Sequence, residues 1–200
     1  MTLLAAAAAV AWAVEADPGG DRLVAVVVVT TVVAAALGMV LVVRAQRRRH
    51  AAAAAWAQAR AWDHDPDGGE LHRRYTGPPF DLGHARASER VLRGRHAGRD
   101  VVCFDYRYDL TTGSGVRGDR HERTTRWAVV AVRRPPGSSA DETRLDHPGV
   151  RALLEQRPGH EWRLDGGDLL LLREGELDLA TLDEDVALCG AVLDALGARG

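Results

Sequence analysis

The sequence predicts an α+β protein in which a transmembrane helix precedes a cytoplasmic domain with an antiparallel β-meander and a C-terminal helix. Three patterns predict this class: a charge-free apolar run at residues 23–43, two-residue alternation between residues 91 and 132, and three-and-four apolar spacing near the C-terminus. The 200 residues carry a formal charge of −2, and all 26 basic residues are arginine. This composition excludes disordered chains and polycationic nucleic-acid binders, so we expect no nucleic-acid partner.

The apolar run at residues 23–43 reads LVAVVVVTTVVAAALGMVLVV and holds no charged side chain. At about 1.5 Å per residue, a helix of this length spans about 30 Å, the hydrocarbon thickness of a bilayer. Only a helix satisfies all of its own backbone groups in lipid, so the β preference of valine is overridden there. The run therefore predicts a transmembrane helix, with the lipid bilayer as its partner.

The residues flanking this run predict its orientation. Arg44, Arg47, Arg48 and Arg49 follow it, whereas mainly acidic residues precede it. Because an arginine excess stays in the cytoplasm, the rest of the chain is expected on the cytoplasmic side of the inner (cytoplasmic) cell membrane. The same four arginines are candidates for contact with anionic lipid, although they could equally act only as a topological signal.

A second apolar stretch, LLAAAAAVAWAV, lies within residues 1–14 and is shorter than the roughly 17 residues that a span needs. It fits a short first transmembrane helix, with residues 15–22 as an external turn. It also fits the apolar region of a cleaved signal peptide, but the positive residues that should precede such a region are missing. We favour the helical hairpin, and both interpretations leave the C-terminal part in the cytoplasm.

Residues 44–62 predict a helical stalk, because alanine, glutamine and arginine dominate them and glycine and proline are absent. Trp56 and Trp62 are six positions apart in this segment, a rotation of roughly 600°, so we expect them to face different directions. The turn-forming residues 63–69 should end the helix. Residues 63–200 then form the cytoplasmic α+β domain.

The first part of that domain predicts three strands. Val91–Arg95 and Val101–Leu110 flank a hairpin turn at residues 96–100, and a third strand covers Arg126–Val132. On the second strand, one face should pack in the core: Val102, Phe104, Tyr106, Tyr108 and Leu110. The opposite face should meet water: Val101, Cys103, Asp105, Arg107 and Asp109.

The last third of the chain predicts alternating elements. A short strand at residues 143–145 precedes a helix over residues 150–156 that Pro148 opens. Strands at residues 162–164 and 169–172 then flank the turn Asp165-Gly-Gly-Asp168. The C-terminal helix follows, with Asp178 expected as its N-cap.

Charge divides the domain into two halves. Residues 84–134 hold twelve arginines and six acids, a balance of +6, whereas residues 135–200 have a balance of −8. We expect the two halves to attract each other within the fold, which is the simpler account. The alternative is a basic surface for anionic lipid or a protein partner. Its candidate residues are Arg93, Arg95, Arg99, Arg117, Arg120 and Arg123.

Several motifs resemble functional sites without meeting their requirements. Gly113–Gly118 matches G-x-G-x-x-G but leads into another strand, whereas a dinucleotide site needs a helix there. Asp63-x-Asp65-x-Asp67-Gly begins like a calcium loop, but its twelfth position is Arg74 instead of glutamate. The histidines are scattered, no serine lies in G-x-S-x-G, and Cys103 and Cys189 are expected to be packing residues. We therefore predict no catalytic residue, no cofactor and no metal site.

Five stretches resemble an uncharacterised family of actinobacterial membrane proteins: Trp56–Trp62, Tyr75–Phe80, Val102–Tyr108, Trp127–Val132 and Gly166–Leu172. The resemblance covers most of residues 44–196. It implies one or two N-terminal transmembrane helices, an alanine-rich stalk and a cytoplasmic domain, and it implies no activity. This chain is shorter than the family pattern between residues 136 and 162, which affects one or two of the expected strands.

These observations predict a non-enzymatic role, as an interaction or scaffolding domain held at the membrane that binds a protein partner or a second copy of the chain. Two alternatives stay open. One is a membrane-tethered enzyme or small-ligand-binding domain, which needs a pocket with converging polar groups. The other is an accessory subunit of a larger membrane complex.

Overall fold

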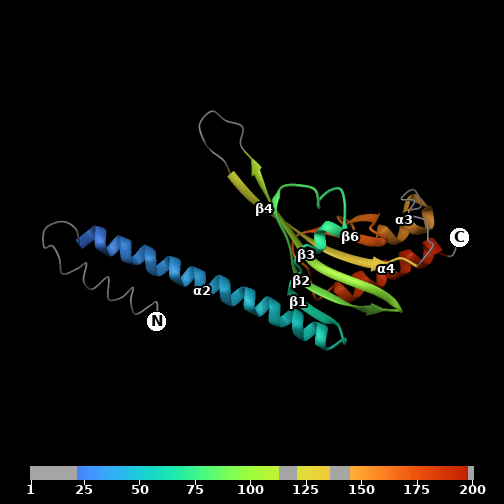
Figure 1. Ribbon diagram of the computed structural model, residues 1–200, viewed down its shortest axis with the longest axis horizontal. Helices are drawn as coiled ribbons and strands as arrows, with labels where there is room; N and C mark the ends of the chain where they lie inside the picture. Colours follow the sequence, from blue (N-terminus) through green and yellow to red (C-terminus); the bar gives the residue numbers. More distant parts are fainter. Residues whose placement is uncertain (1–21, 113–120, 136–144, 198–200) are drawn as a thin grey trace. The chain divides into compact units, whose positions relative to one another are not determined.

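The computed structural model describes residues 22–112, 121–135 and 145–197 (Figure 1). The chain divides into two compact units, Met1–Arg49 and His50–Gly200. The short first helix expected at residues 1–14 lies outside the described residues, as does nearly all of the external turn expected at 15–22. The second unit begins at His50, so residues 50–62 of the expected stalk belong to it.

The N-terminal unit contains most of helix α2 (Arg22–Gln58, 37 residues). Its apolar side chains are exposed, for example Leu41 at 67% and Met39 at 66%. Among the described residues, α2 is the one helix long and apolar enough to cross a membrane, with a mean hydropathy of 2.3. Leaving such a surface in water is costly, so the helix fits a membrane anchor.

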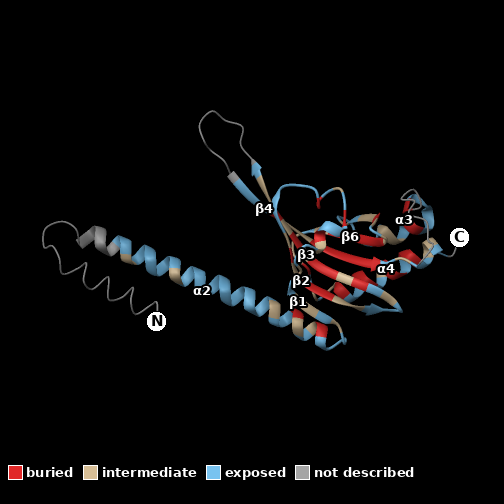
Figure 2. Ribbon diagram, in the orientation of Figure 1, coloured by how far each residue is buried: buried red, intermediate tan, exposed pale blue. Residues whose placement is uncertain are grey.

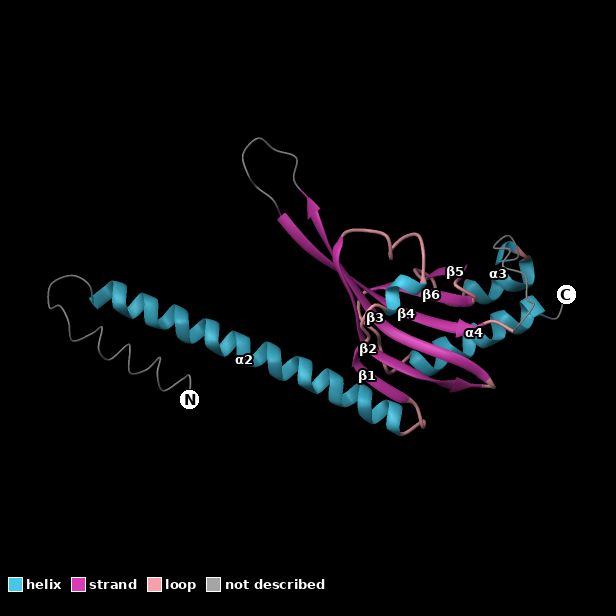
Figure 3. Cartoon of the chain, viewed as in Figure 1, coloured by secondary structure: helices cyan, strands magenta, loops and turns pink. Residues whose placement is uncertain are grey.

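The second unit is built on a six-stranded antiparallel sheet with the order β1-β2-β3-β4-β6-β5 (Figure 3). Its strands are β1 (Asp63–Asp67), β2 (His84–His96), β3 (Arg99–Thr112), β4 (His121–Arg133), β5 (Glu161–Asp165) and β6 (Asp168–Glu174). With the N-terminal apolar helix and a C-terminal helix, this sheet confirms the α+β prediction.

Two tight turns lie where the sequence placed them. Ala97 and Gly98 join β2 to β3 with φ angles of 49° and 79°. Gly166 and Gly167 join β5 to β6 with φ angles of 56° and 83°. Two successive positive φ angles are typical of the type I′ turn, whose twist matches that of paired strands.

Helices cover one face of the sheet: the end of α2, α3 (Pro148–Leu154) and α4 (Leu182–Gly197). Leu92, Leu169 and Leu171 of the sheet pack there against Val186 and Cys189 of α4. Figure 2 shows buried residues along the sheet and along α4. The prediction that Val101 and Cys103 meet water was wrong, because both lie in this core with exposures of 1% and 0%. The two-residue alternation suggested one buried face, whereas both faces are covered.

The aromatic face of the sheet is the second core, as predicted. Phe104, Tyr106 and Tyr108 of β3 are buried there with Tyr75 and Phe80. The cover is the segment between β1 and β2, which contains only the short 3-10 helix η1 (Leu71–Arg74). The aromatic core is therefore closed by a loop and not by a long helix.

Residues 63–67 form the edge strand β1, so their assignment to a helix-ending turn was wrong. Asp65 pairs with Val91 of β2, and its carboxylate forms an ion pair with Arg93 at 3.3 Å. β1 is an edge strand of the sheet, where proline is found more often than in central strands. Pairing to a neighbour that lies far away in the sequence outweighed the local turn preference.

The predicted directions of Trp56 and Trp62 were also wrong. Helix α2 ends at Gln58, and Ala61 adopts a φ of 55°, which turns the chain back. The two indole rings therefore meet edge to face, with centroids 5.2 Å apart.

The C-terminal helix begins at Leu182, so Asp178 is not its N-cap. The Asp178 carboxylate instead accepts a hydrogen bond from the Ala180 backbone N–H at 3.0 Å, within the loop before the helix. In the short strand expected at residues 143–145, Leu145 lies in a 3-10 turn, and the other two residues lie outside the described ones.

Candidate functional site

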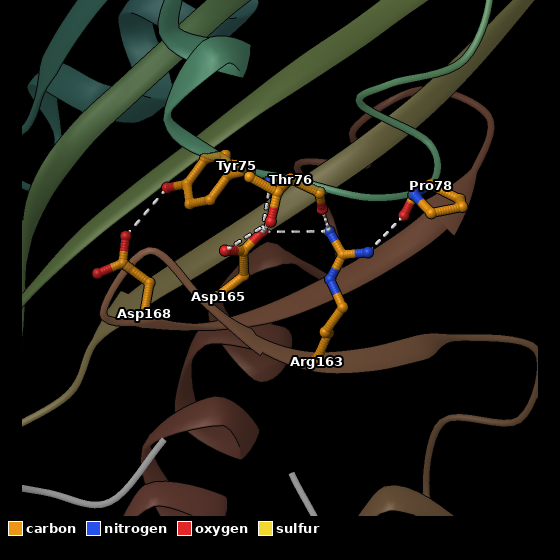
Figure 4. A network of polar contacts seen from close by, with 6 residues as sticks. All are labelled: Tyr75, Thr76, Pro78, Arg163, Asp165 and Asp168. Carbon is orange, nitrogen blue, oxygen red and sulfur yellow. Dashed lines mark hydrogen bonds and ion pairs between the residues drawn. The ribbon is translucent and has the colours of Figure 1, made fainter. Parts of the chain in front are cut away.

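A polar network holds the loop over the aromatic core, and Figure 4 shows it from close by. Asp168 opens β6 and is 3% exposed. Its carboxylate accepts a hydrogen bond from the Tyr75 hydroxyl at 3.0 Å and forms ion pairs with Arg74 at 3.0 Å and Arg133 at 3.2 Å. Burying a charge is costly unless it is paired, and here two guanidinium groups and a phenol pair it.

Arg163 of β5 supplies the second half of this network. Its guanidinium donates to the carbonyl oxygens of Thr76 at 2.5 Å and Pro78 at 2.6 Å (Figure 4). The Asp165 carboxylate accepts from the Thr76 backbone N–H at 2.6 Å. We name the contacts of Tyr75, Thr76 and Pro78 with Arg163, Asp165 and Asp168 the loop clamp. Its groups are engaged with one another, so its evident role is to fix the loop.

Burial, with Asp168 nearby, raises the pKa of the Tyr75 hydroxyl above its ordinary value. The phenol therefore stays protonated at neutral pH and remains the hydrogen-bond donor to Asp168. This direction agrees with a structural role, because a catalytic tyrosine base needs a lowered pKa.

A buried ion pair joins β2 to β3 near the start of the C-terminal segment. Arg90 lies 2.7 Å from Asp105, and their side chains are 8% and 14% exposed. Asp105 also accepts from the Leu177 backbone N–H at 2.6 Å, while Arg90 donates to the Leu177 carbonyl at 2.8 Å. Burial raises the pKa of Asp105, and Arg90 opposes that shift. The pair thus anchors residue 177 to the sheet.

His72 and Ser88 form a contact that sequence reasoning missed. The Ser88 hydroxyl oxygen accepts from the His72 backbone N–H at 3.1 Å and lies 3.2 Å from His72 Nδ1. Serine beside histidine is the pair used in nucleophilic catalysis. Here, however, Ser88 is 1% and His72 is 6% exposed, and burial lowers the pKa of His72. The contact joins η1 to β2, and its 16-residue spacing matches no motif.

A surface groove of about 500 Å³ lies between α3 and β5. Its lining residues are Leu145, Asp146, Arg151, Leu154, His160, Glu161 and Trp162. Two ring nitrogens there, Trp162 Nε1 and His160 Nδ1, are shielded from solvent and have no hydrogen-bond partner. We name this site the β5 groove. None of its residues was a candidate from the sequence, because they come from three separate short segments.

The candidate arginines of the domain do not form one patch. Arg99 is opposite His96 at one end of β3, whereas Arg123 is opposite Leu110, eleven residues further along that strand. At about 3.3 Å per residue, these positions are roughly 36 Å apart. Arg117 and Arg120 lie outside the described residues.

Each described arginine of that set also faces a carboxylate. The pairs are Arg93–Asp65 at 3.3 Å, Arg95–Asp100 at 3.2 Å, Arg99–Asp194 at 2.5 Å and Arg123–Glu174 at 3.8 Å. Asp194 and Glu174 belong to the acidic half of the chain, which favours attraction between the two halves. Arg44, Arg47, Arg48 and Arg49 are exposed on α2, after its apolar part; their contact with lipid stays a prediction.

Both cysteines are fully buried in the helix-covered core. Burial raises the pKa of both thiols, so neither is poised as a thiolate nucleophile. Within residues 22–112, 121–135 and 145–197, no three His, Cys, Asp or Glu side chains gather as metal ligands would.

Comparison with known proteins adds no relative. No protein-family model matches the chain, no curated protein matches it, and no solved structure matches it. The resemblance to actinobacterial membrane proteins therefore stays a prediction.

Proposed function

We propose that this protein is a membrane-tethered interaction protein whose domain binds a partner protein through the β5 groove, on the cytoplasmic side of the cell membrane. The exposed apolar helix α2 supports the tether. The groove is the observation that supports the binding role. It lies beside β5, the last strand in the sheet order. In that sheet, β5 pairs along one of its edges with β6.

The composition of the groove resembles that of a protein-binding surface. Leu145, Leu154 and Trp162 supply apolar area, while Asp146, Arg151 and Glu161 supply charge around it. Interfaces typically combine an apolar, aromatic centre with a polar rim, and tryptophan is prominent among residues that dominate binding energy.

The proposed sidedness rests on the four arginines that follow the apolar run, since arginine-rich flanks stay in the cytoplasm. A reporter active only in the cytoplasm, fused behind Gly200, should be active, and a reporter active only outside should be silent. The reverse pattern would overturn the cytoplasmic address and every role that depends on it.

The binding role is tested by site-specific photo-crosslinking in cells. A photo-reactive amino acid at Glu161, on the groove rim, should capture a discrete partner, whereas the same group at Arg73, exposed on η1, should not. Trp162→Ala should abolish the Glu161 crosslink while the unfolding transition of the purified chain persists. Crosslinks that are equal at both positions, or that Trp162→Ala leaves unchanged, would contradict a groove-mediated interaction.

A small-ligand site is the second candidate, because a volume of about 500 Å³ falls within the range of ligand pockets. A ligand-binding groove predicts that a small molecule raises the melting temperature of the full chain and that Trp162→Ala removes this shift. A captured protein together with the absence of any such shift would favour the interaction role.

A further inference from the structure

The end of helix α2 meets β1 through two histidines. The rings of His50 on α2 and His64 on β1 have centroids 5.9 Å apart. Both side chains are half-buried, and both His50 Nδ1 and His64 Nε2 are shielded from solvent without a hydrogen-bond partner. Ala53 and Ala57, on the following turns of α2, are 0% and 1% exposed within the core. The histidine contact therefore lies where this helix end docks on the sheet.

The charged groups around His64 disfavour protonation of its imidazole ring. His50 faces it from α2 and Arg90 acts on it from β2, while Asp65 is its neighbour on β1. The Asp65 carboxylate is already shared with Arg93 at 3.3 Å. A neutral imidazole can leave one nitrogen as a bare lone pair, but an imidazolium carries an N–H on both nitrogens. In the docked state, an N–H on His64 Nε2 has no hydrogen-bond acceptor.

We propose that the His50–His64 contact is a proton-sensitive latch, which holds residues 50–58 of α2 against the sheet at neutral pH and releases them on acidification. The docked helix keeps His64 Nε2 away from water and from acceptors. The released helix returns this nitrogen to water, where it accepts a proton freely. Protonation therefore favours release.

The sign of the pH dependence follows from the same contacts. Burial first, then His50 and Arg90, lowers the pKa of His64 below its ordinary value of 6.5, although Asp65 opposes this. Docking is therefore strongest above the ordinary pKa and weakens as the pH falls from there towards the lowered pKa. One such group changes the docking equilibrium by at most about tenfold per pH unit.

Hydrogen exchange of the full chain in nanodiscs tests the latch, with rates expressed as protection factors so that intrinsic pH effects cancel. Between pH 7 and pH 5.5, the protection of residues 51–58 should fall severalfold. His64→Gln should abolish this fall, because glutamine does not titrate. His96→Gln, at an exposed histidine that ends β2, is the matched control and should behave like the wild-type chain.

A side-chain NMR titration of the wild-type chain keeps the test independent of how His64→Gln folds. The His64 resonance should titrate below the ordinary histidine pKa of 6.5. A His64 that titrates at or above this value would overturn the proposal. So would a loss of helix protection that His64→Gln leaves unchanged, because His72, whose pKa burial also lowers, would then explain it.

Discussion

The two faces of the sheet are closed in different ways. The helix-covered face is sealed by apolar contact, with Leu169 and Leu171 against Val186 and Cys189 of α4. The aromatic face is covered by a loop, whose backbone groups are not all paired within a helix or a sheet and take other partners. The loop clamp supplies them, since Arg163 binds two loop carbonyls and Asp165 binds a loop N–H. An irregular cover thus depends on a few polar residues, whereas a helical cover depends on many apolar ones.

The largest effect is expected on the helix-covered face. Leu169 is fully buried, and Leu169→Ala should lower the free energy of unfolding by about 3 kcal/mol through lost burial and the cavity left behind. Chemical denaturation in detergent measures this. Leu82→Ala, at a leucine that is 39% exposed, is the control and should change stability by less than about 0.5 kcal/mol. Equal losses in the two variants would mean that this face is not a packed core.

An intermediate and local effect is expected in the loop clamp. Arg163→Ala removes the charged donor of two loop carbonyls and should cost about 2 kcal/mol. The loop should open before the rest of the domain, so chymotrypsin should cut after Tyr75 or Phe80 faster than in the wild-type chain. Arg73→Ala, whose guanidinium forms an ion pair with the exposed Glu70, should leave the cleavage rate unchanged. Unaltered cleavage in Arg163→Ala would show that the clamp does not hold the loop.

The smallest effect is expected for a single hydroxyl. Tyr75→Phe removes one hydrogen bond to Asp168 and should cost about 1 kcal/mol at neutral pH. Because the pKa of Tyr75 is raised by burial, the wild-type chain should lose stability as the pH rises above about 10. The Tyr75→Phe variant should lose less stability over this pH range. Tyr106, whose pKa burial raises to about 12, should account for part of the loss that remains. Identical alkaline slopes would place the Tyr75 hydroxyl in water.

The sequence predicted those parts of the fold that are governed by local rules. Apolar length identified α2, turn-forming residues between strand-like segments identified both hairpin turns, and aromatic alternation on β3 identified one core face. The errors arose where distant segments decide. Residues 63–67 look like a turn until β2 pairs with them, and Cys103 looks exposed until α4 covers it.

The candidate sites were harder to predict, because each one is assembled by tertiary contact. Arg163 and Thr76 are 87 residues apart in the chain, and His72 and Ser88 are brought together by a segment with little regular structure. The β5 groove likewise combines residues before α3 with residues of β5. The sequence did identify the arginine excess, and the described ion pairs show much of it neutralised within the domain.

The edge strand β1 has a consequence for how copies of this chain meet. Proteins confined to a membrane plane encounter one another often, and an open strand border invites stacking into fibrils. Pro66 interrupts this strand, and three aspartates lie along it, Asp63, Asp65 and Asp67. Two such borders would repel each other, so β1 discourages edge-to-edge association of copies. The strand at the opposite border of the sheet, β5, contains no proline.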